Sequence, residues 1–118
     1  MIKGKQSIAF NASPYIEESA SVVGKKEGEG PLGSRFDMVG LDDMFGEDTW
    51  EKAESSMQKE ACQLALGKAH LTAGAIRYLF GGDLLRQGVA TSLGVEQLQI
   101  PMFGLYGACS CLLYTSDA

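Results

Sequence analysis

Apolar side chains recur at steps of three and four residues between positions 49 and 70, which is the spacing of one face of an α-helix. Most intervening positions are charged or polar, and an Ala-Gly pair at 73–74 ends the pattern. We therefore predict a helix over 49–70 with one stripe facing a core. Asp48 and Glu51 stand three residues apart at its start and predict a capping box. The predicted stripe comprises Trp50, Ala53, Met57, Ala61, Leu64 and Ala65, with Lys68 at its end.

Two largely apolar runs follow this helix. The first, at residues 75–80, is bounded by glycines, and the second, at residues 99–106, has Pro101 near its start. Each has the length and composition of a buried strand, and residues 84–93 between them predict a shorter helix that Gly88 weakens. The alternation of strand, helix and strand predicts a parallel crossover in an α/β fold. Ligands in such folds bind at the carboxyl ends of the strands, where Asp83 and Cys109 fall.

The first 48 residues carry weaker patterns. Short β-like runs lie at 7–10 and 21–23, and a glycine-rich charged segment lies at 24–33. Its glycines lack the spacing of a phosphate loop, so we predict a hairpin tip or a mobile surface loop rather than a phosphate cradle. An acidic cluster at 42–48 does not match an EF-hand loop, which leaves helix capping as its predicted role.

The composition argues against several classes of protein. The chain has 118 residues, enough for one small domain, and a formal net charge of −5 without the clustered basic face that binds nucleic acid. It contains neither a run of about 18 apolar residues nor the apolar segment of a secretory signal. Its three cysteines are an odd number, which argues against a disulfide framework and for a reducing compartment. With a single histidine beside them, no zinc site is expected.

Cys109 is the candidate nucleophile of the chain. It follows the second predicted strand in the sequence Gly-Leu-Tyr-Gly-Ala-Cys-Ser, at an expected turn from strand to helix. Free N–H groups at the start of a helix favour the thiolate form of such a cysteine. A buried structural thiol would have the same surroundings in sequence, because free cysteine is among the most buried residue types. The residues alone leave both interpretations open.

Three segments carry a family resemblance: Phe-Gly-Glu-Asp-Thr-Trp-Glu-Lys-Ala-Glu at 45–54, Gly-Asp-Leu-Leu at 82–85 and Gly-Leu-Tyr-Gly-Ala-Cys-Ser at 104–110. Together they resemble the stage V sporulation protein AD family, within the thiolase-fold or ketoacyl-synthase-like superfamily. The resemblance implies a thiolase-like α/β fold, here an incomplete N-terminal half with a mixed or parallel sheet and covering helices. Residues 1–110 would form this partial domain. Residues 111–118 depart from the family and look like translated sequencing-adapter read-through, so we expect a non-native tail, with a genuine short C-terminus as the alternative.

The same resemblance implies a sporulation protein that binds dipicolinate and supports its uptake, as the calcium chelate, into the forespore. It also implies partners from the same sporulation operon, a homodimer when full length, and a place at the periphery of the inner spore membrane without a transmembrane segment. No cofactor and no protein-bound metal are expected. The residues expected to line the ligand cleft are Asp83, Gly107, Ala108 and Cys109.

An enzyme is the alternative that the resemblance implies. Cys109 falls on the acyl-accepting cysteine of condensing enzymes, so acyl transfer of the thiolase or ketoacyl-synthase type would use it as the nucleophile. The His or Asn partners of those enzymes lie in the second half of the fold, so no catalytic set can be assembled from these residues. His70, the only histidine, is expected to be a cation at a helix end or a surface residue rather than a base. Whether the chain is an enzyme stays open.

Overall fold

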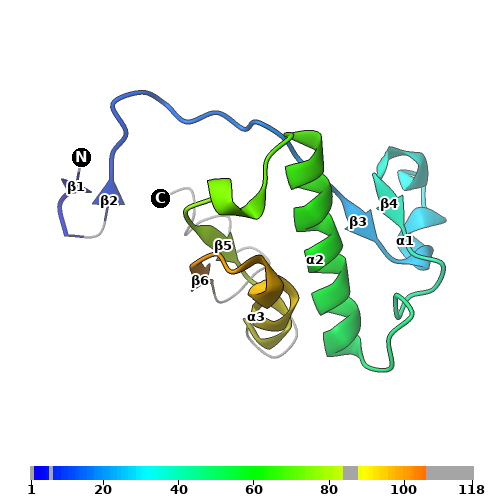
Figure 1. Ribbon diagram of the computed structural model, residues 1–118. Coiled ribbons are helices and arrows are strands. Elements are labelled where there is room, and N and C mark those ends of the chain that lie inside the picture. Colours follow the sequence, from blue (N-terminus) through cyan, green and yellow to red (C-terminus); the bar gives the residue numbers. More distant parts are fainter. Residues whose placement is uncertain (1, 6, 84–87, 106–118) are drawn as a thin grey trace.

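The computed structural model describes residues 2–5, 7–83 and 88–105, arranged as a mixed α/β molecule around one long helix (Figure 1). This helix, α2, spans Trp50–Lys68 and confirms the helix predicted at 49–70. Its N-cap is Thr49, whose hydroxyl accepts a hydrogen bond from the Lys52 N–H at 3.3 Å. The predicted cap at Asp48 is wrong, because the helix begins one residue too late for it. Asp48 instead pairs with the Lys52 ammonium at 2.8 Å.

Helix α2 lies between two other parts of the molecule and buries more than one face. Helix α3 (Val89–Val95) packs against one side of it and strand β3 (Val22–Val23) against another (Figure 1). Ala53 is buried as predicted, whereas Trp50 at the first turn is 59% exposed and Ser55, on the predicted polar face, is buried. The prediction of a single core-facing stripe is therefore incomplete, because periodicity does not reveal a second neighbour.

The strand–helix–strand order predicted after α2 is confirmed. Strands β5 (Leu79–Gly81) and β6 (Met102–Gly104) pair in parallel, and α3 lies between them in the chain. Both strands are shorter than the apolar runs that predicted them. The 3-10 turn η2 (Ala73–Ala75) stands at the start of the first run, and η4 (Glu96–Leu98) follows α3. Residues 84–87 of the predicted second helix lie outside the described residues.

The glycine-rich segment forms a short crossover. Strands β3 and β4 (Met38–Val39) pair in parallel, and α1 (Lys25–Gly28) and the 3-10 turn η1 (Gly33–Arg35) connect them. Parallel strands cannot be joined by a tight hairpin, so the predicted hairpin tip is wrong. Glycine is needed at Gly33, because a Cβ there would overlap the carbonyl oxygen of Gly28.

The N-terminus extends away from this body. Strands β1 (Ile2–Lys3) and β2 (Ser7–Ile8) form an antiparallel pair, and residues 9–20 then run to β3 as an exposed arm without helix or strand (Figure 1). Tyr15 and Ile16 on the arm are both 91% exposed. The arm helps to explain a radius of gyration of 15.4 Å, against about 13.5 Å for a compact chain of this length.

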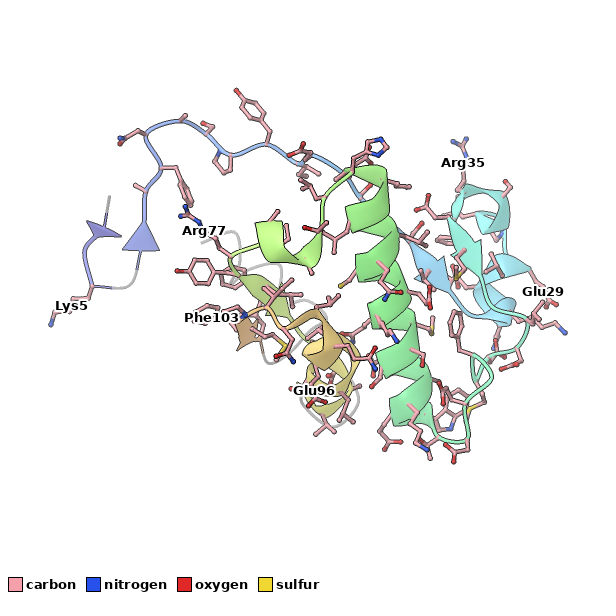
Figure 2. All side chains as sticks on the ribbon, viewed as in Figure 1. Lys5, Glu29, Arg35, Arg77, Glu96 and Phe103 are labelled. Carbon is pink, nitrogen blue, oxygen red and sulfur yellow. The ribbon has the colours of Figure 1, made fainter. Side chains whose placement is uncertain are left out.

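The β5–β6 pair has two different faces. Gly81 faces α3, because a Cβ on it would lie 2.7 Å from the Thr91 methyl. Side chains alternate along a strand, so Phe80 and its partner Phe103 point the other way, with ring centroids 5.3 Å apart. Tyr78 joins them at 5.8 Å from Phe103, which lies on the side of the sheet away from α2 (Figure 2). Among the described helices, none has both the length and the hydropathy needed to cross a membrane.

Candidate functional site

A cavity of about 490 Å³ opens where β6 ends beside the first turns of α3. Its lining runs along β6 and reaches the carboxyl end of the strand at Gly104 and Leu105, which is the end of a parallel sheet at which α/β folds bind ligands. One wall comes from α3 and the residue before it, and the other comes from β6 and the residue after it. The described lining residues are Gly88, Val89, Ser92, Leu93, Met102, Gly104 and Leu105.

Asp83 lies behind the α3 wall, two residues after β5. It is only 6% exposed. Its Oδ1 accepts from the Gly88 N–H at 2.9 Å, and its Oδ2 accepts from the Thr91 N–H at 2.9 Å and the Thr91 hydroxyl at 2.8 Å. Burial alone would raise the pKa of this carboxyl, but the donors on Gly88 and Thr91 outweigh it and leave the pKa lowered. Asp83 is thus ionised and occupied by internal donors.

Helix α3 is also fixed from its other side, where it crosses α2. The Ser55 hydroxyl donates to the Ala90 carbonyl oxygen at 2.7 Å, and both residues are buried. Gly94 permits the close approach, since a Cβ there would lie 2.5 Å from the Ser55 carbonyl oxygen. The cavity wall made by α3 therefore has a defined position relative to both α2 and β5.

The structure places only one of the four predicted cleft residues. Asp83 stands at the predicted strand end, next to the cavity wall but not in the lining, and contact between it and a ligand stays a prediction. Gly107, Ala108 and Cys109 lie outside the described residues. The last described residue, Leu105, lines the cavity, so the chain leads from the cavity toward these three positions.

The chemistry of the described lining is mostly apolar. The Ser92 hydroxyl donates to the Gly88 carbonyl oxygen at 2.7 Å, so its proton is already used. None of the described lining residues carries a cationic side chain. These walls suit a flat or aliphatic group, and an anionic ligand would require donors from elsewhere in the protein.

His70 lies away from this cavity, just past the end of α2. It has a positive φ of 55° and an exposed side chain, and its N–H donates to the Gly67 carbonyl oxygen at 3.1 Å. It therefore occupies the helix-end surface position expected for it. On α2 itself, half-buried Cys62 has a thiol pKa raised by burial, which makes it a poor nucleophile.

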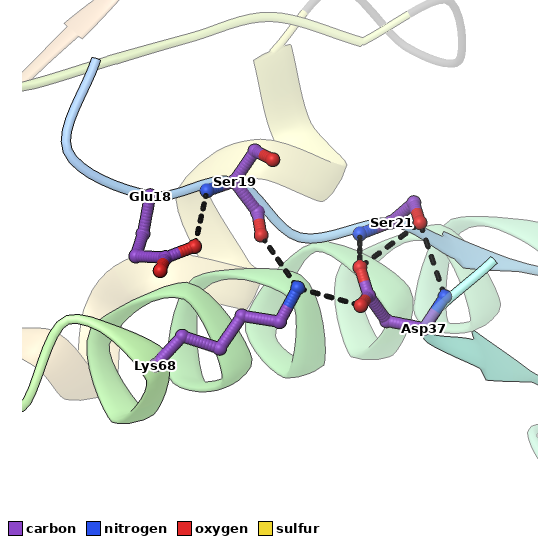
Figure 3. A network of polar contacts seen from close by, with 5 residues as sticks. All are labelled: Glu18, Ser19, Ser21, Asp37 and Lys68. Carbon is purple, nitrogen blue, oxygen red and sulfur yellow. Dashed lines mark hydrogen bonds and ion pairs between the residues drawn. The ribbon is translucent and has the colours of Figure 1, made fainter. Parts of the chain in front are cut away.

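A second polar cluster joins α2 to the strand pair on its other side, and no sequence signal marked it (Figure 3). The Lys68 ammonium contacts Asp37 Oδ1 at 2.6 Å and the Ser19 carbonyl oxygen at 2.9 Å. The other carboxylate oxygen of Asp37 accepts from the Ser21 N–H at 2.8 Å and the Ser21 hydroxyl at 3.1 Å. Lys68 first, and then Ser21, hold the pKa of Asp37 below its usual range. Because 31 positions separate Lys68 from Asp37, local spacing could not predict their contact.

The acidic cluster at 42–48 organises the loop before α2. Asp42 Oδ1 accepts from the N–H groups of Met44 and Gly46 at 2.8 and 3.2 Å, and Asp43 Oδ1 accepts from the Lys26 N–H at 2.9 Å. Glu47 accepts from a hydroxyl on α2 at 2.6 Å. Within the described ranges, no three His, Cys, Asp or Glu side chains gather closely enough to hold a metal ion.

Comparisons with known proteins identify both a family and a relative. The family model described as Stage V sporulation protein AD (SpoVAD) matches residues 4–116. The chain is also similar to the curated Stage V sporulation protein AD of Bacillus subtilis (strain 168), with 36% identity over 115 residues. That match covers 97% of this chain and 34% of the relative, so the chain spans about a third of the relative's length.

Proposed function

Because the chain belongs to the stage V sporulation protein AD family, we propose that it serves sporulation by binding dipicolinate and supporting its uptake into the forespore. The family match over residues 4–116 carries this proposal. Dipicolinate is a pyridine ring with two carboxylates, and it would arrive as its calcium chelate. The protein would act with other products of its operon, at the periphery of the inner spore membrane, and as a homodimer at full length.

The cavity beside β6 supports part of this proposal. Its described lining is apolar and could accept the face of an aromatic ring between α3 and β6. The two carboxylates would need hydrogen-bond donors that this lining lacks. We propose that backbone N–H groups at Gly107, Ala108 and Cys109 supply them, since this segment follows the cavity wall at Leu105.

Calorimetric titration of the full chain with dipicolinate, with and without calcium, tests the proposal. The Bacillus subtilis relative is titrated in parallel, and isophthalate, which replaces the ring nitrogen by a C–H, serves as the matched ligand control. We expect saturable binding of dipicolinate by both proteins and weaker binding of isophthalate. If neither protein gives a saturable signal up to millimolar ligand, the binding function fails. If only the relative binds, the site needs residues outside this chain and the proposal fails for the chain.

The position of Cys109 supports acyl transfer as a second candidate. β6 ends at Gly104, and in the sequence Cys109 follows five residues later. In α/β folds, ligands bind beyond the carboxyl ends of the strands. A nucleophilic thiol requires a lowered pKa, so Cys109 should react with iodoacetamide faster than free cysteine near neutral pH. Peptide mapping would separate its rate from those of Cys62 and Cys111. A rate no greater than that of free cysteine would count against acyl transfer and leave binding as the function.

A further inference from the structure

The width of the cavity is set by where α3 begins. Of its described lining residues, Gly88, Val89, Ser92 and Leu93 belong to the start of α3 or directly precede it. The other wall belongs to the β6 region, which is tied to β5 by the hydrogen bond from the Leu105 N–H to the Gly81 carbonyl oxygen at 2.8 Å. Any displacement of the first turn of α3 relative to β5 therefore changes the space available to a ligand.

One side chain ties that first turn to β5. The N-cap residue of α3 is Gly88, which has a φ of 97° and no side chain with which to cap the helix. Asp83, which lies just after β5, caps the helix instead. It accepts hydrogen bonds from the Gly88 N–H, the Thr91 N–H and the Thr91 hydroxyl. Both residues of this link are buried, since Asp83 is 6% exposed and Thr91 only 1%.

Packing of Thr91 on β5 further restricts the position of the first turn of α3. Its methyl group lies over Gly81, where even an added Cβ would come within 2.7 Å of it. The Thr91 hydroxyl and N–H both end on the same carboxylate oxygen. Thr91 is thus fixed by its methyl against the strand and by its donors against Asp83. A shift of the helix start would break both contacts together.

From this geometry we propose that Asp83 is a positioning residue of the ligand site, which holds the α3 wall of the cavity through Gly88 and Thr91 without touching the ligand. The proposal rests on the binding function proposed above. Asp83 would act on the ligand through the α3 wall and not by direct contact. Its carboxylate is buried, lies outside the cavity lining and already accepts three hydrogen bonds from within the protein. A carboxylate in direct contact with the calcium-free dianion of dipicolinate would also repel it.

Dipicolinate affinity of the full chain tests this with four variants. Asp83→Asn replaces an acceptor-only group by one with donors facing Gly88 and Thr91, and we expect affinity to fall about tenfold or more. Thr91→Val keeps the shape but removes the hydroxyl, with an expected loss of about fivefold. Thr91→Ser keeps the hydroxyl but lacks the methyl over Gly81, and it should bind more tightly than Thr91→Val. Asp37→Asn, in the cluster on the other side of α2, should leave affinity unchanged even though it weakens the fold.

The outcomes separate positioning from contact. If Asp83→Asn binds like the wild type, the proposal is overturned. If Asp83→Asn loses binding while Thr91→Val does not, Asp83 contacts the ligand directly and the proposal is again overturned. A common loss in all variants, including Asp37→Asn, would reflect general destabilisation and would also overturn it.

If the wild type does not bind dipicolinate, only the proposed function is contradicted. A measurement without ligand then still tests the positioning role of Asp83. Amide hydrogen exchange reports the order of the cavity wall directly. Asp83→Asn and Thr91→Val should accelerate exchange more at the amides of Gly88, Thr91 and Ser92 than in the middle of α2. Unaltered exchange at these amides would show that Asp83 does not position the wall.

Discussion

Two aspartates on opposite sides of α2 use the same contacts in opposite surroundings. Asp37 and Asp83 each accept from a backbone N–H and a hydroxyl of one residue, Ser21 or Thr91. Asp37 is exposed and adds the Lys68 ammonium, whereas Asp83 is buried and adds only the N–H of Gly88. Both carboxyls have a lowered pKa, one chiefly through a cation and the other through neutral donors that overcome burial.

This difference teaches that similar hydrogen bonds contribute unequally to the fold. Water can replace the partners of Asp37 when a bond is lost, because the cluster is open to solvent. Water has no such access to Asp83 and Thr91, so each lost bond there leaves a buried group unsatisfied. The half of the molecule around α3 is therefore expected to be sensitive to changes that the half around β3 and β4 tolerates.

The largest effect is expected from Asp83→Ala. It leaves two N–H groups and one hydroxyl without their acceptor, at a cost of about 4 kcal/mol in the free energy of unfolding. Urea unfolding followed by circular dichroism measures the loss, with Asp37→Ala as the matched control on the exposed side. A loss no larger than that of Asp37→Ala would contradict the comparison.

Gly94→Ala is expected to have the next largest effect, at the crossing of α2 and α3. The new methyl would lie 2.5 Å from the Ser55 carbonyl oxygen, and separating the helices should cost about 2 kcal/mol. Gly67→Ala is the matched control in α2, since nothing lies within 4 Å of its added Cβ. There the better helix propensity of alanine should stabilise by up to about 1 kcal/mol. Equal effects of the two substitutions in urea unfolding would show that the crossing is not closely packed.

The sequence predicted the features that depend on residues close together in the chain and missed those that depend on distant residues. Periodicity predicted α2, and two apolar runs predicted the parallel β5–β6 pair, because both signals depend on neighbours in sequence. The burial of Ser55 escaped prediction because it depends on Gly94, which belongs to a different helix. The parallel pairing of β3 with β4 escaped it because two-residue strands carry no period.

For the candidate site, the sequence predicted the location better than the contacts. It placed Asp83 at the end of a strand, where the structure has it. It could not show that the carboxylate turns toward Thr91, because that requires the position of α3 above Gly81. The Asp37–Lys68 pair had no signal at all, since isolated charges on distant segments look like ordinary surface residues. The assignments at Gly107, Ala108 and Cys109 stay predictions.

Acid should destabilise the fold by protonating both aspartates, and Asp37 and Asp83 should contribute unequally to that loss of stability. A carboxyl with a lowered folded-state pKa stabilises the fold at pH values above its unfolded pKa, about 4. That contribution is lost as the pH falls from there through the folded-state pKa of Asp37 or Asp83. Urea midpoints measured from neutral to acid pH should therefore decline, and Asp83→Asn should flatten the decline more than Asp37→Asn. An unchanged slope in Asp83→Asn would contradict the lowered pKa of Asp83.

Salt should have the smallest effect on the molecule, but it should distinguish the two carboxyls most clearly by its effect on their pKa values. At about 1 M NaCl the screening length falls to about 3 Å, which weakens exposed ion pairs and leaves hydrogen bonds between buried groups intact. The pKa of Asp37, lowered mainly by Lys68, should move back toward its ordinary value, while the pKa of Asp83 should stay where it is. Carboxyl carbon chemical shifts followed through a pH titration at low and high salt measure both groups in one sample. Lys68→Met should reproduce the effect of salt on Asp37 at low salt and leave Asp83 unaffected. If salt moved both pKa values equally, the distinction between a cation-held and a donor-held carboxylate would be lost.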